Sequence, residues 1–142
     1  MPQASYSLII QRPVEAVFAF VADGENCLQW RPGVVDIRRV AGDGVGTRYA
    51  QGVRGPMGRR ISADYEITVW EPNRRLEFQT LTGPARPHGR YDFEEVDGGT
   101  RLTFSLDAQL SGLRKLLMGG AVQRTMDSEV RTLDKLKRVL EG

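Results

Sequence analysis

The chain has 142 residues and a formal net charge of +2, from 20 basic and 18 acidic residues. This length predicts one domain, residues 1–142, with a core large enough to need no disulfide or metal for stability. The near balance of charge argues against a nucleic-acid partner, because proteins that bind nucleic acid usually concentrate basic residues on one face.

Cysteine and histidine are too scarce to build a metal centre. Cys27 is the single cysteine and His88 the single histidine, and neither stands at ligand spacing from a carboxylate. We therefore expect no intrachain disulfide, no metal and no other cofactor, which fits a reducing compartment. The first residues lack the features of a signal peptide, and no stretch approaches the length of a membrane span. The expected location is the cytoplasm.

The first part of the chain predicts one strand followed by two short helices. Apolar residues alternate in Ser5–Gln11, which is typical of a strand. Pro13 suits the first turn of a helix, and the apolar stripe that follows it ends at Asp23-Gly24. A second short helix is expected to run to about Trp30.

Six strand-like segments come next, joined by short turns. The clearest alternation runs from Ile61 to Val69 and predicts one strand with one buried face. Parallel neighbours need long crossover connections, so these strands must be largely antiparallel. The segments are Val34–Val40, Gly46–Arg54, Ile61–Val69, Leu76–Thr80, a strand around Tyr91 and Phe93, and Leu102–Leu106.

From about Ser111 the apolar period changes to that of a helix. Leu113–Met118 forms a short apolar patch, and a continuous stripe runs over Val122–Leu140. Gly119-Gly120 lies between them, and two glycines cost about 2 kcal/mol relative to alanine in a helix interior. We therefore expect a break there, near the mouth of a cavity, so that the first segment acts as a lid.

These elements predict an α+β fold. The apolar face of the sheet needs a cover, and the C-terminal helix is the only long element available. We expect a curved antiparallel sheet of about seven strands, with the two short helices between its first and second strands. Such a sheet wrapped around one helix leaves an internal cavity.

Five short motifs in this order resemble the SRPBCC, or START-like, superfamily. The match covers essentially the whole chain, and its nearest branch resembles the bacterial polyketide cyclase/dehydrase-like proteins. The motifs are Pro13 with Val17-Phe18 and the later Trp30, Gly44-Val45-Gly46-Thr47, Trp70-Glu71-Pro72-Asn73-Arg74-Arg75-Leu76, Gly98-Gly99-Thr100-Arg101-Leu102-Thr103 and Leu133–Glu141.

The resemblance implies the helix-grip fold, in agreement with the element order. It also implies a role in binding lipids, sterols, quinones or polyketides, and some members of the superfamily are cyclases. The motifs themselves are turns and packing positions, so they indicate the fold and say little about activity.

An inward-facing set of apolar and aromatic residues is the candidate ligand site, because ligand pockets are mostly apolar with a few placed polar groups. Tyr65, Tyr91 and His88 are weak catalytic candidates. Strand parity places His88 outside the sheet unless a bulge turns it inward. The ligand-binding set is Tyr49, Tyr65, Ile67, Val69, Phe78, Tyr91, Phe93, Phe104, Leu117 and Met126.

The sequence favours binding of a hydrophobic or aromatic small molecule, without catalysis. A polyketide cyclase or aromatase is the alternative, with interior tyrosine, histidine or arginine groups moving protons. A protein-interaction or chaperone-like role is the third reading, and it would need an exposed apolar patch. The chain alone leaves open whether the protein forms a homodimer.

Overall fold

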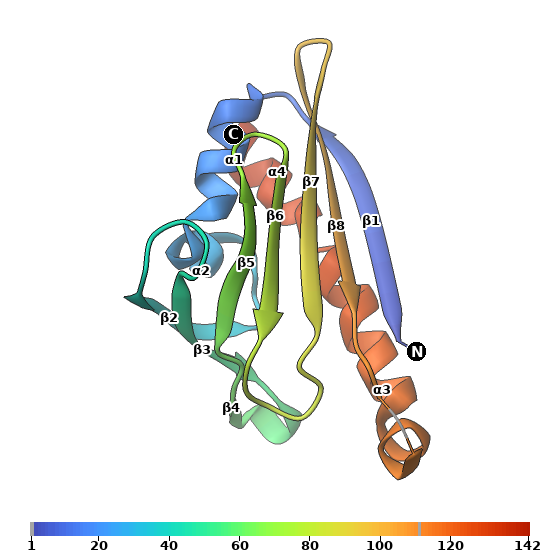
Figure 1. Ribbon diagram of the computed structural model, residues 1–142. Helices are drawn as coiled ribbons and strands as arrows, with labels where there is room; N and C mark the ends of the chain where they lie inside the picture. Colours follow the sequence, from blue (N-terminus) through green and yellow to red (C-terminus); the bar gives the residue numbers. More distant parts are fainter. Residues whose placement is uncertain (1, 111) are drawn as a thin grey trace.

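The fold is a strongly curved antiparallel sheet with a bent helix across its concave side (Figure 1). The computed structural model describes residues 2–110 and 112–142. Within them the strand order is β1-β8-β7-β6-β5-β3-β2, and a short β4 pairs with β3. The strands are β1 (Gln3–Ile10), β2 (Val34–Ala41), β3 (Arg48–Arg54), β4 (Arg60–Ser62), β5 (Tyr65–Glu71), β6 (Arg75–Thr80), β7 (His88–Val96) and β8 (Gly99–Asp107).

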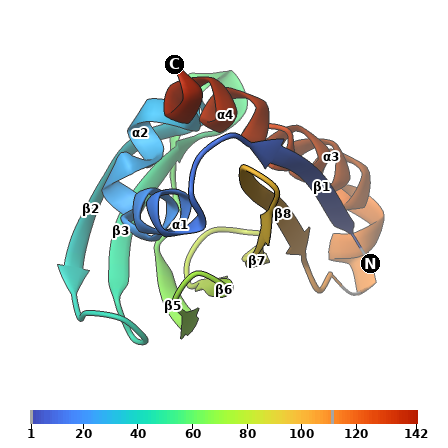
Figure 2. The ribbon, with the colours of Figure 1, turned by 90° about the horizontal axis from the view of Figure 1, so that it is seen from above.

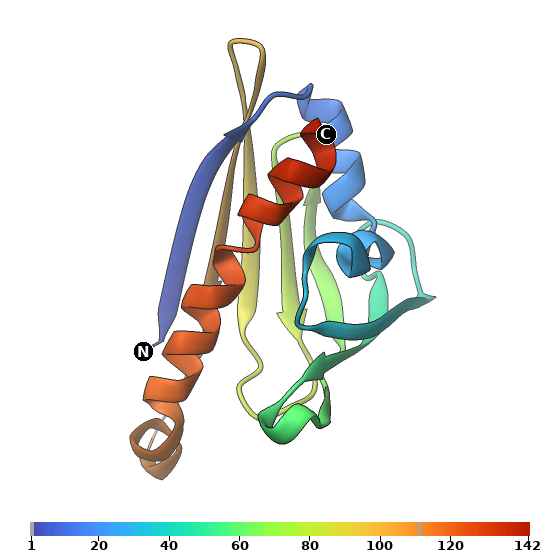
Figure 3. The same ribbon diagram turned by 180° about the vertical axis from the view of Figure 1, so that it is seen from behind.

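The helices lie on the concave side of this sheet. The first group is α1 (Val14–Ala22), the 3₁₀ turn η1 (Gly24–Asn26) and α2 (Cys27–Trp30), which connect β1 to β2. Figure 2 shows α1 and α2 within the curve of the sheet, and Figure 3 shows α3 (Gly112–Val130) and α4 (Leu133–Glu141) running diagonally across it. The predicted helix-grip fold is confirmed, with the short β4 as a strand the sequence did not separate.

The alternating segment Ile61–Val69 was expected to form one strand, and this expectation is wrong. The segment is divided between β4 and β5, and β5 contains a register shift between Ile67 and Val69 against β6. Val69 consequently lies opposite Glu77, and Trp70 lies opposite Leu76, which is buried.

The bulge reverses which residues of β5 face inward. Directly opposed residues share a face of a sheet, so Val69 lies on the outer face with Glu77. Trp70 turns inward and packs edge-on against Phe18, with ring centroids 5.5 Å apart. One extra residue shifts side-chain parity by one, and simple alternation could not reveal it. The prediction that Val69 lines the ligand site is therefore wrong, because Val69 lies on the outer face of the sheet.

The expected break at Gly119-Gly120 is also wrong. Helix α3 runs through both glycines, and the interruption lies instead at Arg131-Thr132, between α3 and α4. There the Thr132 hydroxyl donates to the carbonyl of Glu129, and tight three-residue turns replace the α-helical bonding. The glycine cost is a propensity and was not large enough to end the helix. The bend therefore lies within the apolar stripe Val122–Leu140. The helix has no hinge at Gly119-Gly120, where one was expected for a lid.

The bent helix is attached to the edge strand β1 and to the core. The side-chain amide of Gln123 accepts from the backbone N–H of Gln3 and donates to its carbonyl, at 3.1 and 2.7 Å. Tyr6 donates to Asp134 of α4 at 2.7 Å. On the other side of the helix, apolar residues are buried in the core: Met126, Val130, Leu133, Leu136 and Leu140. This burial fixes α3 and α4 over the concave face.

Candidate functional site

Aromatic rings cross the concave face of the sheet in an unbroken series. Tyr49 stacks on Tyr65 with centroids 5.0 Å apart, and Phe78 lies 5.1 Å from Tyr65. Tyr91 stacks on Phe104 at 4.4 Å. The sequence placed these rings together correctly, because strand alternation sends every second residue to one face.

The structure brings most of the predicted ligand-binding set to this concave face. Phe78 is half-buried, and the buried members are Tyr49, Tyr65, Ile67, Tyr91, Phe93, Phe104 and Met126. Leu117 does not join them, because its side chain is 71% exposed on a part of α3 that the sheet does not cover. Helical periodicity identifies residues that share a face, but it does not say how far the covered part of a helix extends.

One charged side chain enters this interior from the end of α2. Arg31 has a side chain only 11% exposed, and its Nε donates to Glu129 of α3 at 2.5 Å. Its Nη1 donates to the side-chain oxygen of Gln51 at 3.1 Å and to the Cys27 sulfur at 3.5 Å. Cys27 of helix α2 and Gln51 of strand β3 thus hold the guanidinium of Arg31 against helix α3.

Burial and charge act in opposite directions on Arg31. Burial is the largest single influence and disfavours its charged form. Glu129, together with weaker contributions from Cys27, Tyr91 and Tyr65, outweighs burial and raises the pKa of Arg31 well above its ordinary value. The guanidinium is therefore a permanent positive charge inside the fold. It also acts electrostatically on the hydroxyls of Tyr65 and Tyr91.

These two tyrosines differ from their neighbour Tyr49 in their bonding. The Tyr49 hydroxyl accepts from the backbone N–H of Gly24 at 3.0 Å and donates to the Ala22 carbonyl at 3.4 Å. The hydroxyls of Tyr65 and Tyr91 make no hydrogen bond with any of the residues described, although both side chains are buried.

Burial raises the pKa of both Tyr65 and Tyr91 above its ordinary value. Each hydroxyl therefore keeps its proton near neutral pH. The Nη2 group of Arg31 likewise makes no hydrogen bond with the described residues. The interior thus presents three hydrogen-bond donors without a protein acceptor.

A groove on the surface borders this cluster at Glu129. It has a volume of about 440 Å³ and lies between the turn after α2 and one face of α3. Glu129, the ion-pair partner of Arg31, is part of its wall. The other lining residues are mostly small, namely Pro32, Gly33, Ala121, Arg124, Thr125, Ser128 and Thr132. Glu129 is therefore the residue that connects the groove wall to the Arg31 ion pair.

The expected cavity among the aromatic residues is not where the described pockets lie. The groove beside α3 shares no residue with the predicted ligand-binding set, and neither does a second pocket of about 260 Å³ around His88. The rings are in contact with one another at the centroid distances given above. Of these two pockets, the groove is the one that includes a neighbour of Arg31, namely Glu129.

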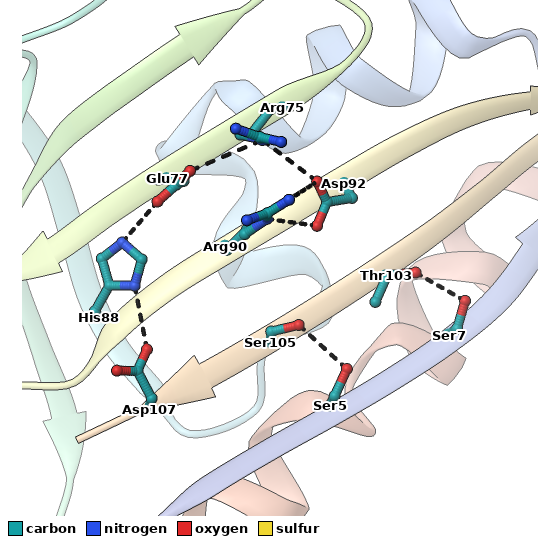
Figure 4. A network of polar contacts seen from close by, with 10 residues as sticks. All are labelled: Ser5, Ser7, Arg75, Glu77, His88, Arg90, Asp92, Thr103, Ser105 and Asp107. Carbon is teal, nitrogen blue, oxygen red and sulfur yellow. Dashed lines mark hydrogen bonds and ion pairs between the residues drawn. The ribbon is translucent and has the colours of Figure 1, made fainter.

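His88 lies on the outer face of the sheet, as strand parity indicated. Figure 4 shows its ring between Glu77 and Asp107, with nitrogen–oxygen distances of 2.9 and 3.2 Å. Arg75 and Arg90 continue this network to Asp92. The three catalytic candidates therefore do not form one site, because the sheet separates His88 from Tyr65 and Tyr91.

Sequence reasoning missed Arg31, Gln51 and Glu129. In the sequence, Arg31 stands in the turn after the second short helix. Glu129 is a charged residue within the apolar stripe of the C-terminal helix, and it follows Met126 by three residues and so shares a helix face with it. The spacing from Met126 could have identified Glu129 as a residue that faces the core. No pattern in the sequence distinguished Gln51 in this way.

Two further properties concern the described residues only. No group of three histidine, cysteine or acidic side chains is gathered there in a way that could hold a metal ion. None of the helices in that part of the chain is long and apolar enough to cross a membrane.

Comparison with known proteins agrees with this architecture. A family model described as polyketide cyclase/dehydrase and lipid transport matches residues 1–141. The chain belongs to this family. No curated protein matched its sequence.

Solved structures share the fold of this polyketide cyclase/dehydrase family member over its whole length. TTHA0849 from Thermus thermophilus is 25% identical, with a TM-score of 0.81, and the match covers 96% of this chain and 95% of that one. A START superfamily protein from Mycobacterium smegmatis is 16% identical, with a TM-score of 0.79 and coverage of 98% and 97%.

The di-domain ARO/CYC protein StfQ from the steffimycin biosynthetic pathway also matches. It is 11% identical, with a TM-score of 0.81, and the match covers 98% of this chain and 50% of StfQ. At this identity the likeness concerns the fold alone.

Proposed function

We propose that this protein binds a hydrophobic or aromatic small molecule that carries an acceptor oxygen, and that this oxygen is held at Arg31. The observation that carries the proposal is the set of unpartnered interior donors: Nη2 of Arg31 and the hydroxyls of Tyr65 and Tyr91. None of these three atoms is sealed from solvent, because Nε of Arg75 is the only buried and unpartnered side-chain nitrogen or oxygen among the described residues. A ligand oxygen placed among these groups would accept hydrogen bonds that the protein itself leaves unmade.

The chemistry of the donors defines the ligand. Arg31 is charged and both tyrosines are protonated near neutral pH, so the cluster offers hydrogens and positive charge. A carbonyl, carboxylate or phenolate oxygen fits such a site, whereas a cationic group does not. The volume of the groove, about 440 Å³, lies within the range of small-molecule sites and would take the apolar body of the ligand.

The family supports the same class of ligand. Its description names polyketide cyclases, dehydrases and lipid transport, which share a largely apolar substrate or cargo. Within this class the groove beside α3 would be the entrance.

Anilinonaphthalene sulfonate is a suitable probe, because it joins an aromatic body to an anionic oxygen group. Its fluorescence on titration should report binding to the wild-type protein. Arg31→Met should weaken that binding about tenfold or more, the expected loss for a charge-assisted hydrogen bond. Arg48→Met is the matched control, because Arg48 pairs with Glu66 on the surface and its side chain is 57% exposed.

Circular dichroism should first establish that both variants are folded. Equal affinity in the wild type and in folded Arg31→Met would overturn the proposal. So would a wild-type protein that binds neither this probe nor an uncharged aromatic ketone. Tyr91→Phe gives an independent check, since it removes one donor and leaves the buried ring in place.

A cyclase is the second candidate, and one observation favours it. Arg31, Tyr65 and Tyr91 lie close enough to act electrostatically on one another inside the fold. Such groups could donate protons or hydrogen bonds to an enolate that forms during ring closure. Incubation with a synthetic poly-β-keto thioester, followed by mass spectrometry, would detect a dehydrated cyclic product. Binding without turnover would leave the first proposal standing and exclude this one for that substrate.

A further inference from the structure

Three segments lie at the same end of the molecule. They are the turn between β3 and β4 (residues 54–60), the loop between β6 and β7 (residues 81–87) and the first turns of α3. Figures 1 and 3 show this end from opposite sides, with α3 projecting beyond the sheet and the β3–β4 turn beside the β6–β7 loop. None of the three belongs to the ligand cluster at Arg31.

The most exposed large apolar side chains among the described residues are found at this end. Met57 is 97% exposed at the tip of the β3–β4 turn, and Leu116 and Leu117 are 81% and 71% exposed on α3. Single exposed apolar residues are ordinary on a soluble protein. Three with this degree of exposure on two projecting elements at the same end are not explained by packing within the fold.

The same segments are basic. Arg54, Arg59, Arg60 and Arg86 are exposed, and residues 54–60, 81–87 and 112–120 contain no aspartate or glutamate. The sequence of the α3 segment adds Arg114 and Lys115. Asp36 pairs with Arg60, and no ion pair among the described residues involves Arg54, Arg59 or Arg86. The whole chain carries only +2, so the positive charge at this end is a local concentration.

We propose that this end of the molecule docks on an anionic lipid bilayer. Met57, Leu116 and Leu117 would enter the boundary between headgroups and acyl chains, and the arginines would lie against lipid phosphates. Apolar tips flanked by basic residues are the chemistry that recognises such a surface. The two tips come from separate elements, and a broad flat surface contacts both at once more readily than a single peptide or helix does.

Docking at this end would also orient the groove. Ala121 and Arg124 line the groove and follow the docking segment along α3. A bilayer at the end of α3 would therefore lie next to the route toward Arg31. The inference does not depend on the proposed ligand, because the docking surface and the interior cluster share no residue.

Flotation with lipid vesicles tests the inference. The wild-type protein should float with vesicles that contain phosphatidylglycerol, bind much less to phosphatidylcholine alone, and be released by salt. The variant Met57→Ser/Leu116→Gln/Leu117→Gln should reduce the bound fraction about tenfold or more. Val45→Ser is the matched control, because Val45 is 62% exposed on the β2–β3 turn, away from this end.

Arg54→Gln/Arg59→Gln should lower binding to anionic vesicles, and it leaves the Arg60–Asp36 pair untouched. Absence of binding by the wild type, or equal losses in the triple variant and in Val45→Ser, would overturn the proposal. Concentration-dependent self-association that the triple variant abolishes, without vesicle binding, would assign this end to a protein contact instead. Probe binding at Arg31, measured without vesicles, shows independently whether the interior site works.

Discussion

The two faces of the sheet differ in whether their polar side chains have protein partners. On the outer face, Ser5 pairs with Ser105 at 3.1 Å and Ser7 with Thr103 at 2.9 Å (Figure 4). His88 bridges two carboxylates on the same face. On the inner face, the hydroxyls of Tyr65 and Tyr91 have no protein partner among the described residues.

This difference is informative about function. The polar groups on the outer face are partly exposed to solvent, so their pairing adds little to stability. Because they pair with one another, no ligand is needed to account for them. Even Arg75, whose Nε makes no hydrogen bond, lies 3.5 Å from Asp92. The inner donors have no protein acceptor and are not sealed from solvent, so they are available to a ligand. The concave side is therefore where a ligand is expected, and the following variants test that contrast.

The largest effect is expected for the aromatic series itself. Phe104 is 0% exposed and stacks on Tyr91, so Phe104→Ala should lower the free energy of unfolding by about 3–5 kcal/mol. Urea denaturation followed by circular dichroism measures this. Val45→Ala, at an exposed position, should change it by less than about 0.5 kcal/mol. Similar small losses at both positions would mean that the inner rings are not tightly packed.

The interior ion pair should give the next largest effect. Arg31→Met leaves Glu129 without its partner and should cost about 2 kcal/mol, because both side chains are mostly buried. Arg31→Met/Glu129→Leu should recover much of that loss, since it removes the orphaned carboxylate as well. Urea denaturation of the two variants decides the matter. A double variant less stable than the single one would show that Glu129 stabilises the fold by other contacts.

The neighbouring tyrosines Tyr49 and Tyr65 form a matched pair. Tyr49→Phe leaves the buried N–H of Gly24 without its acceptor and should cost about 1–2 kcal/mol. Tyr65→Phe removes a hydroxyl without a partner and should leave the free energy of unfolding within about 0.5 kcal/mol of the wild type. Equal costs, measured by urea denaturation, would indicate that the Tyr65 hydroxyl is bonded in solution.

The smallest effect is expected on the outer face. His88 is half-exposed between Glu77 and Asp107, and surface ion pairs contribute little. His88→Ala should therefore change the free energy of unfolding by less than about 1 kcal/mol and leave probe binding unchanged. Loss of probe binding in a folded His88→Ala protein would move the functional site to the outer face.

The sequence was sufficient for the element order and for most of the inner aromatic residues. Short turns between consecutive strands require antiparallel pairing, because parallel neighbours need long crossover connections. Alternation along the strands then assigns Tyr65, Tyr91 and Phe104 to one face. It failed at Val69, because a single bulge in β5 reverses the parity of the residues that follow it. It also failed at Gly119-Gly120, because a propensity of about 2 kcal/mol does not decide where a packed helix bends.

What the sequence determined by itself was the helix-grip fold and the apolar nature of its concave side. Both follow from periodicity and turn chemistry, which act over a few residues. Tertiary structure alone decided the polar centre, because Arg31, Gln51 and Glu129 come from three elements far apart in the chain. Their meeting depends on how the bent helix lies across the sheet. A local pattern carries no information about that contact until the fold has formed.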